Sequence, residues 1–439
     1  MIKTLTSAFK NKDIRKKLLY TLMMLVVIRI GSLLPIPGVD TEYFSTLLSG
    51  FNSGDLSYLS AFTGGSFEKM SLFALSITPY ITSSIIMQLL AIAIPKLEEM
   101  QKEGEDGRKK IAAITRYVTI ALALIESIAM AVGFGRSGLI KGYQGFSTLH
   151  YIVSIIVVVA ALTAGSAMLM WLGERITENG VGNGISIVLL INIISGMPSD
   201  FATLYSTFVA PRTIAKGVLA AAIIIAILVV MVVLVCFLQD GERRIPVQYS
   251  QKVSGRKTFG GQSTNIPLKV NTAGVMPVIF ASSLMQFPVI IAQLFGKSYE
   301  WTRYLSSSYW CRISAPKYSI GLILYIVLLI IFAYFYTSIT FNPIEVADNL
   351  KKAGGVIPGI TPGKSTSDYL NNILNYIVFV GAVGLLIIAL IPIMCTGFFN
   401  ASVSFGGTSV IIIVGVVLET LKQIESQMVN RYYKGFLSE

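Results

Sequence analysis

The residue types that carry out most protein chemistry are few and scattered in this chain. The chain has one histidine, His150, and three cysteines, Cys236, Cys311 and Cys395, with no CxxC pair. A disulfide framework, a Cys/His metal site and a histidine-based catalytic triad are therefore not indicated. The HExxH and GxSxG motifs of hydrolases are absent from the sequence as well. The sequence predicts a protein that is not an enzyme and that has no metal and no cofactor.

Two charged residues lie within long apolar stretches. Glu126 stands in ALIESIAM and Arg29 in VVIRIGSLL. A charge at membrane depth is costly, so such a residue is kept for ion coupling or for an internal partner. A single carboxylate without an intramembrane His or Lys is weak evidence for coupling, and a buried hydrogen bond is favoured for Glu126. Arg29 is expected near the end of its stretch, where it snorkels or pairs.

Composition places the chain in a membrane. Of its 439 residues, 54% are hydrophobic and 13% charged, against about 25% charged in soluble domains. Crossing a bilayer core takes about 20 apolar residues. Ten such stretches predict an all-α polytopic membrane protein with ten transmembrane helices, at residues 18–38, 71–94, 111–134, 151–172, 183–205, 214–238, 270–294, 318–341, 371–395 and 407–426.

The distribution of positive charge predicts the orientation. Alternate loops and the two ends hold 25 of the 35 Lys and Arg residues, and the side rich in these residues is cytoplasmic. Both termini are therefore expected in the cytoplasm. The external loop 295–317 fits this rule less well, because it carries Lys297, Arg303, Arg312 and Lys317. The basic start is not expected to be a cleaved signal, since the first apolar run reaches Leu34 without a small-x-small site.

Ten spans divide naturally into two groups of five. The predicted halves are residues 1–210, with spans 1–5, and 211–439, with spans 6–10. An odd number of spans per half forces the halves into opposite orientations, related by a pseudo-two-fold axis in the membrane plane. Such an arrangement places a pathway between the halves. The relation follows from the count alone, because no residue repeat is visible.

The segment Ser57–Leu90 is apolar but interrupted by Gly64, Gly65, Lys69 and Pro79. Irregular backbone at membrane depth is tolerated only where protein or a water-filled cavity surrounds it. The segment is therefore either a broken helix beside a pathway or a kinked packing helix.

Two long cytoplasmic loops differ from short helix connectors. Residues 239–269 alternate apolar and polar side chains around Ile245, Val247 and Tyr249, which predicts a protruding hairpin. Residues 342–370 contain two Pro-Gly pairs, which predict tight turns beside a short helix. Both loops are basic, either to bind RNA phosphates or acidic protein, or through the ordinary cytoplasmic bias.

Seven segments together resemble the SecY family, the central subunit of the protein-conducting channel. They occur in the family's order along almost the whole chain: LLPIPGVD (33–40), ALSITPYITSSIIMQLL (74–90), ITENGVGNGISI (176–187), RRIPVQYSQK (243–252), QSTNIPLKVNTAGVMPVIFASS (262–283), NPIEVADNLKKAGGVIPGITPG (342–363) and FGGTSVIII (405–413).

The resemblance implies an hourglass pore between the two five-helix halves. A plug at about residues 57–67 would close it externally, formed by Tyr58, Leu59, Ser60, Ala61, Phe62, Thr63, Gly64, Gly65, Ser66 and Phe67. An apolar ring would narrow it at mid-membrane, formed by Ile77, Ile81, Ile185, Leu189, Ile279 and Ile412. Branched aliphatic side chains form a gasket that excludes water when closed.

The resemblance also implies a lateral gate between span 2 and spans 7 and 8, for which the polar residues are Ser83, Ser84, Gln88, Asn271, Ser282, Ser283 and Gln286. Ribosome and motor docking would use Arg243, Arg244, Lys252, Arg256, Lys257, Lys351, Lys352, Thr361 and Lys364. Thr361 departs from the family's pattern, in which arginine is usual at this position of the Pro-Gly turn.

These observations predict a pore-forming subunit of the Sec translocon in a prokaryotic plasma membrane. It would conduct unfolded polypeptides across the membrane and release transmembrane segments sideways into lipid. The implied partners are the small subunits SecE and SecG, the motor ATPase SecA, the ribosome, and the signal sequences of clients. The alternative is an inverted-repeat secondary transporter of a small solute, with Glu126 as its coupling residue.

Overall fold

Helices occupy all ten stretches expected to cross the membrane. The computed structural model describes residues 9–42, 44, 46, 63–135, 148–210, 214–249, 252–254, 257–259, 263–294, 300–312, 316–399 and 407–435. The ten helices are α2 (Lys12–Leu33), α5 (Thr78–Ala93), α7 (Glu105–Phe134), α8 (Thr148–Asn179), α9 (Gly184–Leu204), α10 (Ile214–Asp240), α11 (Met276–Leu294), α13 (Ile320–Thr340), α15 (Lys364–Phe399) and α16 (Gly407–Gly435).

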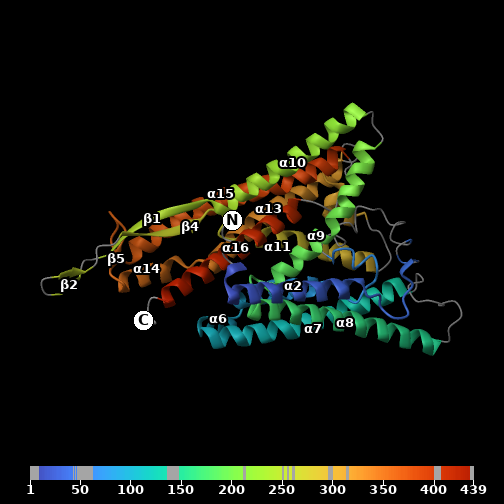
Figure 1. The fold of residues 1–439 in the computed structure, drawn as a ribbon, viewed down its shortest axis with the longest axis horizontal. Coiled ribbons are helices and arrows are strands. Elements are labelled where there is room, and N and C mark those ends of the chain that lie inside the picture. The colour runs from blue at the N-terminus through green and yellow to red at the C-terminus, as the bar shows by residue number, and fades with distance from the viewer. Residues whose placement is uncertain are drawn as a thin grey trace.

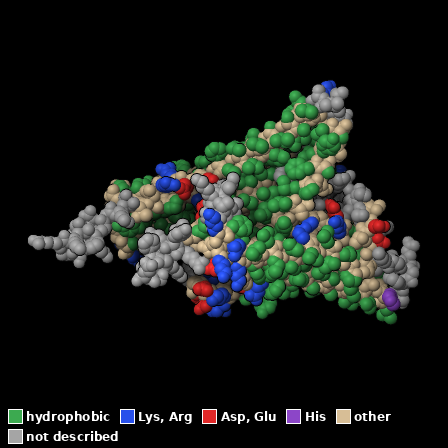
Figure 2. Space-filling model, viewed as in Figure 1, with side chains coloured by type: hydrophobic (Ala, Val, Ile, Leu, Met, Phe, Trp, Pro, Cys, Tyr) green, Lys and Arg blue, Asp and Glu red, His purple; other side chains and the backbone are tan. Residues whose placement is uncertain are grey.

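Apolar side chains cover the outside of the helices, as a lipid-facing surface requires (Figure 2). Within the described ranges, six helices are long and apolar enough to cross a membrane. The number reaches seven if α5 and α6 (Pro95–Lys102), which meet at an angle of 106°, form one broken span. The chain is therefore a multi-pass helical membrane protein, and the full count of ten spans remains a prediction.

The helices pack in two groups (Figure 1). In the first group α7 packs against α5 and α8, and α8 packs against α2 and α9. In the second group α11 packs against α13, α13 against α15, and α10 against α15 and α16. Contacts that join the groups include those of α9 with α16, of α7 with α11, and of residues 205–209 at the end of α9 with α10. This grouping fits a division near residue 210, and the inverted relation of the halves remains a prediction.

A small sheet stands out from one end of the helices (Figure 1). Strand β1 (Glu242–Tyr249) pairs antiparallel with β4 (Ser263–Lys269), with Ile245 opposite Ile266. Strands β2 (Lys252–Ser254) and β3 (Lys257–Phe259) extend this hairpin. The predicted hairpin is therefore confirmed.

The second long loop joins the same sheet. Strand β5 (Gly355–Val356) pairs with the other edge of β1, so that the sheet order is β4-β1-β5. Helix α14 (Pro343–Lys352) precedes β5 and places Leu350 against Ile245 and Val247 of β1. The two predicted protrusions thus form one body with a shared apolar core.

The helix expected at residues 71–94 begins only at Thr78, which corrects the predicted span. Pro79 stands in the first turn of α5, and no residue before Thr78 continues the helix. The preceding backbone instead bonds to the end of α2: the amide of Leu72 donates to the carbonyl of Leu34 at 2.9 Å. Met70 and Ser76 have positive φ angles of 43° and 53°, which a helix does not allow. Residues 63–77 therefore form an irregular segment held by its neighbours.

Candidate functional site: a cavity closed by aliphatic side chains

A cavity of about 430 Å³ lies where the two helix groups meet. Its polar side chains include Gln239 near the end of α10, Lys269 at the end of β4 and Lys422 of α16. Lys422 also donates to Asp240 at 2.8 Å, an exposed ion pair that joins α16 to α10. The cavity therefore has a polar, charged mouth toward the end of the molecule that bears the sheet.

Five of the six predicted ring residues line this same cavity: Ile81 of α5, Ile185 and Leu189 of α9, Ile279 of α11 and Ile412 of α16. The sixth, Ile77, is 1% exposed at the start of α5 and belongs with the others to one apolar cluster. These side chains come from both helix groups. They meet as a dry aliphatic contact, which is the arrangement that a water-excluding constriction requires.

Helix α9 shows what lies beyond the aliphatic side chains. Ile185 and Leu189 are near its start, and Asn192 and Ser195 follow within two turns. Asn192 donates to the hydroxyl of Ser76 at 3.0 Å. At 1.5 Å of rise per residue, Ser195 stands about 9 Å further along the helix axis than Leu189. The irregular segment 63–77 therefore covers the side of the aliphatic contact that faces away from the sheet.

Ser195 connects three parts of the chain. Its hydroxyl accepts a hydrogen bond from Nη1 of Arg29 on α2 at 2.9 Å. The same oxygen lies 3.3 Å from the carbonyl oxygen of Gly64 and 2.7 Å from that of Asn192, and it can donate to either. Arg29 is thus paired inside the protein, as expected for an arginine within a span. The pairing ties α2 and α9 to the predicted plug.

Only part of the predicted plug lies in the described ranges. Residues 58–62 fall outside them, whereas Thr63, Ser66 and Phe67 are buried. The ring of Phe67 packs edge-on against Phe44 with centroids 5.8 Å apart. Met70 and Ala74 continue this apolar cluster, which is separate from that of the cavity side chains. The described part of the plug is therefore packed into the first helix group.

The predicted gate residues divide into three sets. Ser84, Gln88 and Asn271 line the cavity, and Nε2 of Gln88 donates to the hydroxyl of Ser84 at 3.3 Å. Ser282 and Gln286 on α11 are buried, and Ser283 is half-buried. Ser83 faces another helix. Its hydroxyl donates to the carbonyl of Thr115 on α7 at 3.0 Å, and it lies 2.7 Å from the hydroxyl of Thr119. The geometry groups Ser83 with the α5–α7 contact.

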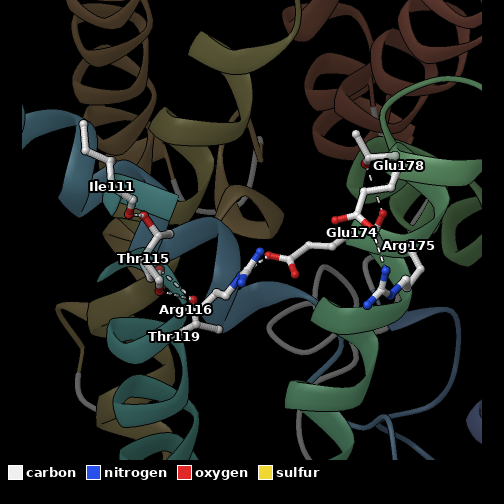
Figure 3. Close-up of polar contacts among 10 residues, drawn as sticks. Ile111, Thr115, Arg116, Thr119, Glu174, Arg175 and Glu178 are labelled. Carbon is white, nitrogen blue, oxygen red and sulfur yellow. Dashed lines mark hydrogen bonds and ion pairs between the residues drawn. The ribbon is translucent and has the colours of Figure 1, made fainter. Parts of the chain in front are cut away.

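Further polar contacts fix α7 against α8 (Figure 3). Nε of Arg116 on α7 donates to Glu174 on α8 at 2.6 Å. The next residue, Arg175, pairs within α8 with Glu178 at 2.7 Å. Thr115 and Thr119 each donate to the carbonyl four residues earlier, so that their hydroxyls stay on the face of α7 that meets α5. The wall of the cavity that α5 forms is therefore backed by a braced pair of helices.

The predicted docking residues surround the sheet and its neighbours. Arg243 and Arg244 are exposed on β1, and Nε of Arg244 donates to Glu242 at 2.7 Å. Lys351 and Lys352 end α14, and Lys364 begins α15. Thr361 is exposed and donates to the hydroxyl of Ser365 at 2.9 Å. Lys252 belongs to β2 and Lys257 to β3, but the side chains of both lie outside the described ranges. All of Arg256 lies outside these ranges as well.

The sequence of the chain matches the SecY family model over residues 71–421. The chain belongs to the SecY family. Protein translocase subunit SecY of Streptomyces galbus is 44% identical over 445 residues, with both chains covered fully. The SecY subunit of Bacillus subtilis is 42% identical over 445 residues, again with full coverage of both.

Solved structures show the SecY fold. The chain aligns with a SecY channel structure concerned with its plug domain at a TM-score of 0.64 and 19% identity, covering 94% of this chain and 92% of that one. It aligns with Sec61 in a canine ribosome-channel complex at a TM-score of 0.59 and 18% identity, covering 94% and 93%. At these identities the likeness concerns the fold alone.

The sequence motifs did not reveal Asn192 and Ser195. Both lie on the face of α9 that carries Ile185 and Leu189, at helical spacings of three and four residues. The spacing could have indicated a common face. Their partners, Ser76 and Gly64, lie more than 110 residues away in sequence, with separations of 116 and 131 residues, and no local pattern reports such a contact.

Proposed function

We propose that the chain is the pore-forming subunit of a protein translocase, which conducts unfolded polypeptides across the membrane and releases apolar segments into lipid. One observation carries the proposal: aliphatic side chains from both helix groups close the floor of a polar-mouthed cavity. A compliant aliphatic closure lets chemically diverse side chains pass without hydrogen-bond discrimination, while its closed form excludes water and ions. The names of the full-length relatives agree with this function.

We assign the ring to Ile77, Ile81, Ile185, Leu189, Ile279 and Ile412, and the plug to residues 57–67. The ring lies at the base of the cavity, and the described end of the plug is held beyond it through Gly64. The mouth of the cavity faces the sheet, which we place in the cytoplasm with both termini. The membrane is the plasma membrane of a prokaryote.

The gate is proposed along the cavity wall between α5 and α11. Ser84, Gln88 and Asn271 supply polar side chains there. Hydrogen bonds between membrane helices average only about 0.6 kcal/mol, so that a seam of this kind opens at little cost. The docking surface is the sheet with α14, for the ribosome and for SecA, and SecE and SecG are the proposed small subunits.

A polar substitution that lets water into the ring tests the assignment of the ring residues. Replacing Ile279, which is 4% exposed, by Asn places an amide in the aliphatic closure, and the ion leak of proteoliposomes should rise severalfold because water then enters the constriction. The matched control is Ile279→Leu, which keeps volume and polarity nearly unchanged. Equal leak from Ile279→Asn, Ile81→Asn and the control would refute the ring.

The small-solute transporter is not favoured. Its coupling residue would have been Glu126, which does not line the cavity, and the full-length relatives are translocase subunits. We also propose that the chain itself catalyses no reaction, so that the driving force comes from the motor or the ribosome.

A further inference from the structure

Residues 300–312 and 316–319, between α11 and α13, form a folded cap. It contains α12 (Thr302–Leu305) and two short turns, η4 (Ser307–Tyr309) and η5 (Pro316–Ser319). Trp310 is 2% exposed, and its indole nitrogen donates to the carbonyl of Tyr304 at 2.8 Å. Its ring lies 5.5 Å from that of Tyr325 on α13. The cap is therefore anchored on α13.

Three cations converge on two neighbouring rings of this cap. The guanidinium groups of Arg303 and Arg312 both lie over Tyr309, at 5.8 Å and 5.1 Å from its centroid. The ammonium group of Lys317 lies 4.9 Å from the centroid of Tyr318. The two tyrosine rings are 5.9 Å apart. Like charges are thus gathered on one small aromatic surface.

These charges are only partly neutralised. Glu300 is the one acidic residue between positions 300 and 320 of the sequence. It lies 3.7 Å from Lys317, with 78% of its side chain exposed. Cation–π contact does not remove charge, so the cap keeps an excess of two positive charges. Nε of Arg312 is also buried and has no hydrogen-bond partner among the residues that the structure describes, so this donor is unsatisfied within the described part of the cap.

The cap lies where the lipid-facing wall begins. Ile320, Ile323 and Leu324 at the start of α13 are exposed by 64%, 62% and 45%. Lys317 lies in the 3-10 helix η5 and precedes Ile320 by three residues, and so stands roughly 6 Å from it along the axis. Because α11 starts next to β4 and α13 ends next to α14, the cap lies at the end of the helices opposite the sheet. Cations and tyrosines at such a boundary occupy the depth of lipid head groups.

We propose that this cap is a binding site for an anionic phospholipid in the leaflet opposite the sheet. The phosphodiester would lie between Arg303, Arg312 and Lys317, and the acyl chains would follow the exposed start of α13. The joint presence of an anion site and an apolar wall favours a lipid over an acidic protein, which would need no apolar wall. The proposal explains why this loop carries cations against the usual bias, and it is independent of the pore assignment.

Quenching by brominated lipid tests the site. With Trp171→Phe as background, fluorescence comes from Trp301 and Trp310 of the cap, since the chain has 3 tryptophans. The protein is placed in phosphatidylcholine vesicles that contain brominated phosphatidylglycerol or brominated phosphatidylcholine. Quenching should favour the anionic lipid about fivefold, and high salt should weaken this preference. The variant Arg303→Gln/Arg312→Gln/Lys317→Gln should remove it.

The matched control is Lys216→Gln, which removes an exposed cation at the start of α10, at the same end of the molecule. It should keep the preference. If the two lipids quench the unmodified cap equally, the proposal is wrong. This test needs no cap variant, so misfolding of the triple variant does not affect it.

Discussion

Gly64 is the residue at which the predicted plug meets the helices around the cavity. Its φ angle is +62°. A Cβ at this position would lie 2.5 Å from Oγ of Ser195 and 2.7 Å from the carbonyl oxygen of Asn192. The carbonyl belongs to α9 and cannot move away alone. Gly65 has a similar φ of +79°, but no atom of the described residues lies within 4 Å of where its Cβ would stand. A side chain at either glycine would strain the backbone, but only a side chain at Gly64 would also clash with α9. Comparing substitutions at the two positions therefore distinguishes backbone strain from steric clash.

We predict that Gly64→Ala loosens the plug and that Gly65→Ala does not. Both substitutions cost about 1–2 kcal/mol because alanine disfavours positive φ, but only Gly64→Ala must also push the segment away from α9. Ion leak through proteoliposomes should rise for Gly64→Ala and stay near the parental level for Gly65→Ala. If the two variants leak equally, the contact with α9 does not hold the plug.

Single residues also show how far the sequence alone could go. The pairs Ile77/Ile81 and Ile185/Leu189 have i, i+4 spacing, which fixes a shared helix face but not what that face meets. Only the family motifs identified them as ring positions. Ser83 and Ser84 are neighbours, so helical geometry sends them about 100° apart, and motifs placed both at the gate. The side chain of Ser84 lines the cavity, whereas that of Ser83 bonds to α7, and the difference depends on tertiary packing.

At the scale of elements, α5 and α11 form the proposed gate, and a cross-link from α5 to Asn271, in the turn between β4 and α11, should hold the gate closed. The three native cysteines are first replaced by serine. Ser84→Cys and Asn271→Cys both place thiols in the cavity, and a short bifunctional reagent should then block export and membrane insertion. The control pair is Ser83→Cys with Asn271→Cys, whose first thiol faces α7. Undiminished export with the first pair fully cross-linked would refute the gate.

The sheet tests a second element. Ile245 of β1 is 2% exposed and packs with Leu350 of α14. Ile245→Ala should destabilise the sheet by about 2–4 kcal/mol, and hydrogen exchange of β1 and β4 should accelerate accordingly. Gln248→Ala, at an exposed position of the same strand, should change stability by less than about 0.5 kcal/mol. Equal protection in both variants would mean that β1 does not depend on its packing against α14.

Element prediction succeeded where one period dominated. Hydropathy located all ten helices, and alternation located the hairpin around Ile245 and Val247. Hydropathy failed to predict that α5 begins at Thr78, because the turns of residues 63–77 depend on hydrogen bonds to the distant end of α2. It also missed β5: two residues carry too little pattern to indicate a strand, and their pairing with β1 arises from the fold of the whole protrusion.

At the scale of the whole molecule, the cavity lies along the seam between the two helix groups. Its aliphatic floor takes residues from α5 and α9 on one side and from α11 and α16 on the other. Contacts of α9 with α16 and of α7 with α11 also join the two groups. A relative movement of the groups would therefore change the constriction directly. The basic sheet, placed at the cavity mouth, would bring a partner to the entrance.

Ribosome binding through this sheet should depend on salt. Removing two cations of the proposed docking surface with Arg243→Gln/Arg244→Gln should lower affinity most at low salt, and should reduce the slope of log K against log salt by roughly one to two. The matched control is Lys96→Gln/Lys109→Gln, which removes two exposed cations from α6 and α7. It lowers the net charge equally but leaves the sheet intact. If both double variants change the slope alike, binding follows the overall charge of the molecule and the sheet is no specific docking surface.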